Sequence, residues 1–431
     1  MRHGRDVVRA LVGSGIMWAT TVFAQTPGVM SLAQAQQVAL QNHPRIASAA
    51  LTADASRAAV REVRSAYYPT LSGNVTGVGA EHNSILSAGF VTTSSMYSRG
   101  AMGVVASQLL TDFGRTSSLE QSAELRDASQ NQNVTNIRAQ VLLDVKEAYY
   151  AALASQSVLK VAQATLDLRR VTLRQVSALA QSALRSTVDV SFAEVNVSQA
   201  ELDLFRAEND AKATHARLSA AIGYGSDQPF SLADEMLPPA LNPEVDTLIA
   251  EALRERPDLA ALRLSRDALQ RFAEAEKRLR NPTISAAAAA GVAPVRDPRI
   301  QETYSGAGIN VNVPVLNGGL FRARREEAES HAAAAGKDVE DLTVQIARDV
   351  RVAWLDANDA FQRLDVTARM VAEANEALRL AQARYDNALG SIVELNQAQL
   401  NQTAAEIASA SAKYEYLGRR AALDYAIGAL R

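Results

Sequence analysis

The sequence predicts a mainly α-helical protein built from two copies of one α-β-β-α-α half. Three observations support this prediction. Pro69-Thr70 recurs as Pro282-Thr283, 213 residues later (282 − 69 = 213). The stretch from 115 to 222 contains neither Pro nor Gly, the two residues that break helices. Four short segments alternate polar and apolar residues, as β-strands do.

The duplication keeps its spacing along the whole chain. The offset is 213 residues up to the copied Pro-Thr and 205 residues beyond it, as for Asp112 and Asn317 (317 − 112 = 205). The difference falls between the two strands of each copy, where a change of loop length would put it. A repeat of about 200 residues is too long for a solenoid unit and indicates a duplicated half. We expect a first copy over 25–223, a linker over 224–245 and a second copy over 246–431.

Each copy is predicted to contain one opening helix and one long helix that turns back on itself. The opening helices are expected over 31–67 and 246–280. The long helix of the first copy is expected over 116–184, about 100 Å at 1.5 Å per residue. Along it, apolar or small residues recur with the heptad spacing of a coiled-coil seam: Val141, Val145, Ala148, Ala152, Ser155, Leu159, Ala162 and Leu166.

The long helices are predicted to turn near 182–187 and near 388–392. In the second turn Gly390 would supply the permissive backbone. The return helices are then expected over 188–222 and 393–427.

The four strands are expected over 71–79, 102–110, 284–292 and 305–313. Each has the length of a tilted strand that spans a bilayer. Four strands are too few to close a barrel. Either several chains contribute strands to one sheet, or the segments form ordinary hairpins that pack on helices.

Residues 1–24 have the features of a secretory signal peptide. A basic start precedes an apolar run that ends at Phe23, and Ala24 precedes a predicted cut before Gln25. The alternative is an N-terminal membrane anchor, although the run is shorter than the ~20 residues that span a bilayer. No second apolar stretch of spanning length follows, so contact with a membrane would use the β-strands.

The composition argues against several classes of protein. The absence of Cys excludes thiolate catalysis, Cys-ligated metals and disulfides. The five His residues have no metal-ligand spacing, and we find no Gly-rich phosphate loop or Ser-His-Asp pattern. A net charge of −3 indicates no nucleic-acid partner. We therefore expect no enzyme activity, no cofactor and no bound metal.

Several motifs, in their joint order, resemble those of the TolC-type outer-membrane efflux proteins, also called outer membrane factors. The resemblance covers essentially the whole chain after the signal segment, although no single motif is specific. The motifs are Ser31-Leu32-Ala33-Gln34-Ala35 with Asn42-His43-Pro44, Leu110-Thr111-Asp112-Phe113-Gly114-Arg115, Pro314-Val315-Leu316-Asn317-Gly318-Gly319, and Arg384-Tyr385 with Gly390-Ser391-Ile392-Val393-Glu394-Leu395.

This resemblance implies a homotrimer in which three chains form a twelve-stranded outer-membrane β-barrel on a long periplasmic α-helical barrel. Closure by symmetry would pair every strand edge. The implied function is a passive exit duct of a tripartite efflux or type I secretion system, surrounded by outer-membrane lipid. A periplasmic adaptor (a membrane fusion protein) and an inner-membrane pump would engage it. The alternative is a secreted or periplasmic coiled-coil scaffold protein.

The resemblance also implies an acidic selectivity ring at the periplasmic tip. Asp189 and Glu394 occupy equivalent positions after the two turns, and a three-fold axis would repeat each one around a narrow channel that favours cations. Glu394 matches the first position of the family's ring, whereas Gln397 stands at the second and predicts a weaker ring. Alternatively, both acids are ordinary helix-start residues favoured by the helix dipole.

In the family, a tip tyrosine and a basic residue also hold the channel closed. Tyr385 matches the tyrosine, with Asp189 as its possible acceptor, but the basic position falls on Gly390. We hypothesise that a Tyr385–Asp189 hydrogen bond holds the gate; otherwise Tyr385 only packs between helices. The turn residues would face the adaptor, although small residues also simply make turns: Ser186, Thr187, Leu389, Gly390 and Ser391.

Overall fold

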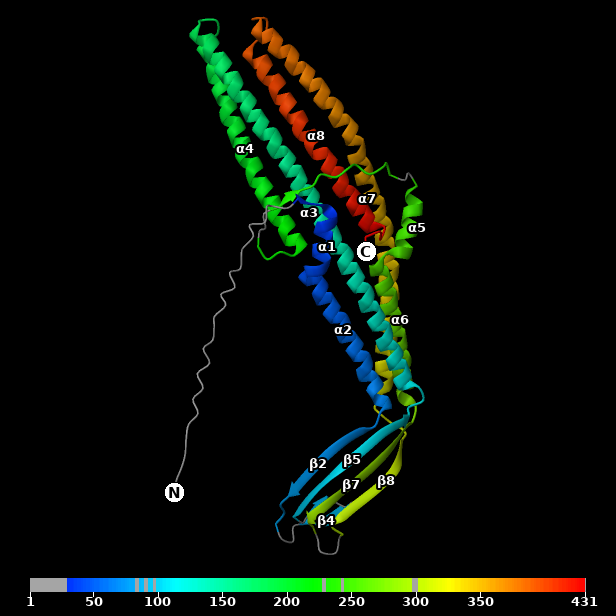
Figure 1. Cartoon of the computed structure of the whole chain (residues 1–431). Coiled ribbons are helices and arrows are strands. Elements are labelled where there is room, and N and C mark those ends of the chain that lie inside the picture. Colours follow the sequence, from blue (N-terminus) through cyan, green and yellow to red (C-terminus); the bar gives the residue numbers. More distant parts are fainter. Residues whose placement is uncertain are drawn as a thin grey trace, which may run out of the picture.

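The computed structural model describes residues 29–81, 85–88, 92–95, 98–226, 230–241, 244–296 and 301–430. The predicted signal segment 1–24 lies outside these residues. A β-sheet lies at one end of the molecule and two helical turns lie at the other end (Figure 1). Two helices, α3 and α7, run along most of this length.

The predicted long helices are confirmed. Helices α3 (Arg115–Gln181) and α7 (Leu320–Asp386) each contain 67 residues. The return helices α4 (Thr187–Ile222) and α8 (Ile392–Ala426) pack beside them as antiparallel partners. Five members of the predicted seam are buried and the other three are half-buried; the buried set is Val141, Val145, Ala152, Ala162 and Leu166.

The prediction of a single opening helix in each copy is wrong. The first is divided into α1 (Leu32–Asn42) and α2 (Pro44–Arg64), and the second into α5 (Val245–Glu255) and α6 (Pro257–Lys277). Proline restricts the preceding residue to extended conformations. His43 (ψ 123°) and Arg256 (ψ 122°) adopt such conformations, so each helix must restart at its proline. Short 3-10 turns, Ser65–Tyr67 and Arg278–Arg280, then lead into the sheet.

The four predicted strands form one antiparallel sheet in the order β2-β5-β7-β8. Strands of the same copy pair as predicted, and β5 and β7 join the two copies. The outer strands, β2 and β8, each leave one edge without a partner among the described residues. The bounds are Thr70–Val78 for β2, Arg99–Thr111 for β5, Thr283–Val295 for β7 and Thr303–Asn312 for β8.

Two small strand pairs were not predicted. Strands β3 (Ile85–Ala88) and β4 (Thr92–Ser95) form a hairpin within the loop between β2 and β5. Strand β1 (Val29–Met30) pairs in parallel with β6 (Ser231–Leu232), which lies in the linker between copies. The buried Tyr149 of α3 places its hydroxyl 2.9 Å from the Met30 carbonyl and 2.7 Å from the Ala233 carbonyl. This contact ties the linker to the central helices.

The elements form one continuous layer whose lateral order changes along its length. Towards the turns the order is α4, α3, α8, α7; towards the sheet it is α2, α3, α6, α7. Adjacent members contact each other, and the two outer members contact only one neighbour. No helix in the described part of the chain is both long and apolar enough to cross a membrane.

The two long helices begin differently. At α3 the buried Asp112 accepts hydrogen bonds from the backbone N–H groups of Gly114 (3.1 Å) and Thr116 (2.7 Å) and from the Thr116 hydroxyl (2.6 Å). At α7 the equivalent residue is Asn317, whose side chain forms no hydrogen bond with any described residue. The first helix start is therefore capped by a carboxylate and the second is not.

This difference predicts unequal effects of two equivalent substitutions. Asp112→Ala should destabilise the protein by about 1 kcal/mol or more, because loss of a capping side chain leaves helix N–H groups unpaired. Asn317→Ala should have little effect. Denaturation followed by circular dichroism in detergent measures both, and equal destabilisation by the two variants would contradict this account of the caps.

Candidate functional site

The two helical turns lie side by side at the end of the molecule opposite the sheet (Figure 1). Each long helix ends with the same backbone motif, in which a left-handed residue follows the last turn. That residue is Ala183 (φ 57°) in the first copy and Ala388 (φ 60°) in the second. The next N–H group bonds back to the helix: Leu184 to the Leu179 carbonyl (2.9 Å) and Leu389 to the Arg384 carbonyl (2.7 Å).

The expectation that Gly390 supplies the permissive backbone is therefore wrong. The left-handed conformation belongs to Ala388, two residues earlier. Gly390 instead provides space: a Cβ there would lie 3.1 Å from the Arg384 Cβ and 3.1 Å from Glu394 Oε2. Arg384 and Glu394 form an ion pair beside it, with 3.0 Å between Nε and Oε1. The missing side chain lets these two residues meet.

The hydroxyl of Tyr385 lies 3.2 Å from Asp189 Oδ2. The phenol comes from the end of α7 in the second copy and the carboxylate from the start of α4 in the first, so this contact joins the two turns. The Tyr385 side chain is only 2% exposed. It packs in a small apolar cluster with Val176, Ala381, Ile392, Leu395 and Ala398. The distance is at the long end of the range for O–H···O bonds.

A basic residue at this contact was missed at the sequence level. The guanidinium of Arg185 lies 4.1 Å from the centre of the Tyr385 ring and donates a hydrogen bond to the Tyr385 carbonyl oxygen. A cation over an aromatic face is attracted by the ring quadrupole. Arg185 is the first-copy equivalent of Gly390 (390 − 205 = 185). The repeat could have identified Arg185: the basic residue that the family pattern places at Gly390 is found instead at the equivalent position of the first turn.

Burial raises the pKa of the Tyr385 hydroxyl to about 12, and the nearby charge of Asp189 adds to the shift. Since the folded pKa lies above the usual tyrosine value of 10.0, the contribution of the neutral phenol to stability is fully present below pH 10. That contribution is lost as the pH rises through about 12. At neutral pH the phenol is a proton donor to the carboxylate.

Of the proposed ring residues, Asp189 lies at the start of α4, and Glu394 and Gln397 lie on the exposed side of α8. Gln397 bonds to Asn401 (2.9 Å), and the Glu394 carboxylate is shared with Arg384. Other polar side chains join the copies near the turns, on the side towards the sheet: Asn196 bonds to Asn396 (2.8 Å), and Gln399 lies 3.3 Å from Thr172 Oγ1. The structure thus brings Asp189 and Tyr385 together, whereas Glu394 and Gln397 lie apart from that pair.

The predicted adaptor-facing residues have clear local roles. Ser186 and Ser391 are N-caps: their hydroxyls accept hydrogen bonds from the N–H groups of Val188 (3.1 Å) and Glu394 (3.2 Å). Thr187 is the first residue of α4. Leu389 is 71% exposed, and its first-copy equivalent Leu184 is 69% exposed. The two turns therefore present a pair of exposed leucines beside small hydroxyl residues.

Within the described residues, no cluster of His, Asp and Glu side chains could hold a metal ion.

Comparison with known proteins identifies the family. The model of the outer membrane efflux protein family matches residues 35–224 and 248–429. The chain belongs to this family. It is a TolC-type outer membrane factor, as its sequence motifs indicate.

The relatives are outer-membrane efflux proteins. The chain is 26% identical over 391 residues to the solvent efflux pump outer membrane protein SrpC of Pseudomonas putida, covering 88% of this chain and 80% of the relative. It is 21% identical over 432 residues to TolC of Escherichia coli, covering 95% and 84%. The crystal structure of the outer membrane protein VceC from Vibrio cholerae has the same fold, with a TM-score of 0.76, 17% identity and coverage of 92% and 96%.

The contact between Arg185 and Tyr385 predicts a local loss of protection when the cation is removed. Arg185→Gln should speed amide hydrogen exchange in residues 182–189 roughly fivefold or more, since a cation–π contact contributes about 0.5–1 kcal/mol at exposed sites and a hydrogen bond about 1 kcal/mol. Hydrogen–deuterium exchange measured by mass spectrometry checks this.

Arg384→Gln is the matched control, because it removes the same charge from an ion pair within the second turn. It should speed exchange near 387–394 and leave 182–189 unchanged. Equal loosening of both turns by either variant would mean that Arg185 does not act through Tyr385.

Proposed function

We propose that this protein is the outer-membrane exit duct of a tripartite efflux or type I secretion system. It would act as a passive conduit that a periplasmic adaptor and an inner-membrane pump engage. The family membership and the efflux relatives support an efflux channel. The main structural support for a duct is that the layer of helices and strands has open edges.

Among the described residues, the layer of a single chain ends at three pairs of outer elements: β2 and β8 in the sheet, α2 and α7 beside it, and α4 and α7 towards the turns. Unpaired edge strands bind other strands, and closure around an axis removes such edges. A homotrimer would join β8 of each chain to β2 of the next and give a twelve-stranded barrel in the outer membrane. The helices would continue it as an α-barrel in the periplasm, with the linker 224–245 outside the two copies.

The internal repeat supports a specific register for this intermolecular pair. Within one chain, β5 pairs with β7 and Ala106 lies opposite Ala288. The equivalent positions are Val311 in β8 (106 + 205 = 311) and Val75 in β2 (288 − 213 = 75). If each junction repeats the same geometry, Val311 of one chain lies opposite Val75 of the next.

The turns would form the periplasmic tip. Its exposed residues Leu184, Ser186, Thr187, Leu389 and Ser391 would meet the adaptor. In this arrangement the Tyr385–Asp189 contact ties the two turns of each subunit together in the closed state. Arg185 supports the contact from the first copy.

The gate hypothesis predicts that Tyr385→Phe opens the channel. Loss of the hydroxyl removes a hydrogen bond to a charged group, about 1.5 kcal/mol at the low end of the range for such bonds. The ratio of open to closed states in planar lipid bilayers should rise roughly tenfold for each contact. Tyr414→Phe removes an equivalent hydroxyl from Asp234, far from the tip, and should leave that ratio unchanged. An unaltered closed fraction for Tyr385→Phe would overturn the gate.

The ring hypothesis predicts a change in ion selectivity. Glu394→Gln should lower the cation-to-anion permeability ratio, because it removes one carboxylate per subunit from the narrow end. Gln397→Glu should raise this ratio, because it adds a carboxylate one helical turn away. Reversal potentials across a salt gradient measure both, and a ratio unmoved by either variant would mean that α8 does not line the selective constriction.

A further inference from the structure

The start of α3 is held to α2 by an ion-pair clamp. The guanidinium of Arg64 bonds to Glu120 through Nε (2.6 Å) and to Glu124 through Nη2 (2.5 Å). One cation from the opening helix therefore bridges two carboxylates of the long helix. This clamp closes the first copy where its helices meet the sheet.

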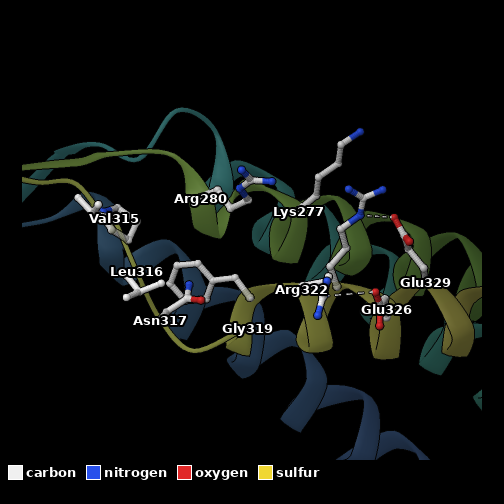
Figure 2. Close-up of a pocket in the computed structure, with 12 residues that line it drawn as sticks. Lys277, Arg280, Val315, Leu316, Asn317, Gly319, Arg322, Glu326 and Glu329 are labelled. Atoms are coloured by element: carbon white, nitrogen blue, oxygen red, sulfur yellow. Dashed lines mark hydrogen bonds and ion pairs between the residues drawn. The ribbon is translucent and has the colours of Figure 1, made fainter.

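The second copy has lost the residues for this clamp. The equivalents of Arg64, Glu120 and Glu124 are Lys277, Arg325 and Glu329 (64 + 213 = 277; 120 + 205 = 325; 124 + 205 = 329). A cation now faces Lys277 where the first copy has a carboxylate. Arg325 pairs within its own helix with Glu329 (2.7 Å). A pocket of about 570 Å³ lies at this place, between the end of α6 and the start of α7 (Figure 2).

The charge of the site has changed sign between the copies. The eight second-copy positions carry four cations and two carboxylates, a sum of +2, and the eight first-copy positions carry one cation and three carboxylates, a sum of −2. The second-copy residues are Lys277, Arg280, Asn317, Phe321, Arg322, Arg325, Glu326 and Glu329, and their equivalents are Arg64, Tyr67, Asp112, Thr116, Ser117, Glu120, Gln121 and Glu124.

Two of the four cations have no carboxylate partner among the described residues. Arg322 and Arg325 are balanced by Glu326 (3.9 Å) and Glu329 (2.7 Å) on the same helix. Lys277 and Arg280 form no ion pair within that part of the chain and lie on the α6 side of the pocket (Figure 2). The pocket therefore holds positive charge that an anion could neutralise.

The start of α7 adds to this potential. Its first N–H groups lack the side-chain cap that Asp112 gives α3, because Asn317 replaces the carboxylate. The N–H groups of Leu320 and Arg322 bond to the Asn317 and Gly319 carbonyls (3.2 and 3.1 Å), so the attraction of this helix start for an anion comes from the helix dipole. Here the uncapped helix and the unpaired cations belong to the same pocket.

Apolar side chains complete the site. Val315 and Leu316, in the segment between β8 and α7, are each 92% exposed and line the same pocket. The end of α6 and the start of α7, whose residues line the pocket, lie where the helices meet the sheet (Figure 1). The pocket thus combines a positively charged site with an adjoining apolar surface.

The first copy indicates that a neighbouring subunit would leave the α6 side of this pocket open. The first copy already has its lateral neighbour, since α6 and β7 of the second copy pack against it. Even so, the side chain of Arg64 is 50% exposed and Leu110, the equivalent of Val315, is 53% exposed. The side of the site that carries the cations therefore stays exposed, although the start of α3 itself contacts the second copy, where Arg278 bonds to the Gly114 carbonyl (2.6 Å) and to Ser118 Oγ (2.6 Å).

We propose that this pocket binds a phosphate group, with Lys277 and Arg280 as its principal cations and the positive end of the α7 dipole adding to the attraction. A phospholipid headgroup would also place its acyl chains on Val315 and Leu316, and a free phosphate would use the cations alone. Only the lipid source rests on the proposed outer-membrane function, which puts the end of the sheet at the level of the periplasmic headgroups.

The test uses the full chain in mild detergent. Native mass spectrometry with added phosphatidylglycerol measures lipid binding, and isothermal titration with inorganic phosphate measures the free anion. The double variant Lys277→Gln/Arg280→Gln should bind roughly 25-fold more weakly, about fivefold for each cation removed. Arg325→Glu offers Lys277 the carboxylate that Arg64 has in the first copy, and should also weaken binding without unfolding the junction.

Arg263→Gln/Arg271→Gln is the matched control, because it removes the same charge from α6 outside the pocket and should leave binding unchanged. Lipid binding alone assigns a headgroup, and binding of both ligands assigns a general phosphate site. No binding of either ligand, or equal loss in the pocket and control variants, overturns the proposal. Bilayer conductance of the same preparations separates this outcome from failure of the exit-duct proposal: conducting pores without phosphate binding refute the site alone.

Discussion

The unpaired edges of the β2-β5-β7-β8 sheet are the constraint on which the rest of the structure depends. Each edge strand presents a row of backbone N–H and C=O groups. Leaving one such group unpaired in an apolar environment costs several kcal/mol. The helical layers continue from this sheet and have open sides in the same places. Any partner that satisfies β2 and β8 therefore also determines what α2, α4 and α7 contact. These open edges are the reason why we propose that one chain is a segment of a closed wall.

The duplication keeps the backbone of this segment constant and lets the side chains diverge at its two ends. The long helices of both copies have the same length and end in the same left-handed alanine. At the tip, Arg185 of the first copy corresponds to Gly390 of the second, so one turn reaches across to its neighbour and the other forms its own ion pair. At the sheet end, the carboxylate Glu120 corresponds to the cation Arg325. The two copies therefore have the same backbone but different charged residues at the tip and at the sheet end. These are the two places where we propose the gate and the phosphate site.

Much of the fold could be predicted from the sequence, because its signals are local. The absence of Pro and Gly from 115 to 222 and the heptad spacing gave the long helices, and alternation gave the strands. The same rules misjudged the opening helices, because the extended conformation forced by Pro44 and Pro257 outweighs a helical pattern on both sides. The pair β1–β6 joins segments of only two residues across 200 positions, which is too short to leave a pattern.

The candidate site was less predictable, because its contacts join residues that are far apart in the sequence. Tyr385 and Asp189 were chosen by resemblance, and their contact depends on two turns brought together by α3–α8 packing. Arg185 was missed because its partner lies 200 residues away, and Gly390 was misjudged because glycine can serve for space as well as for conformation. The pocket beside Lys277 follows only from a comparison of the two copies, position by position.

A cysteine cross-link between subunits tests the closed wall most directly. The chain contains no Cys, so Val75→Cys/Val311→Cys introduces only the chosen pair. Within one chain these positions lie on opposite edges of the sheet, separated by at least three strand spacings or roughly 14 Å, which is too far for a disulfide. Opposite each other across an antiparallel pair they would be near enough. Oxidation of membranes should give a ladder that ends at a covalent trimer on denaturing gels, and reduction should return it to monomer. A chain that stays monomeric under oxidation, with both single variants and the double variant alike, would contradict the account.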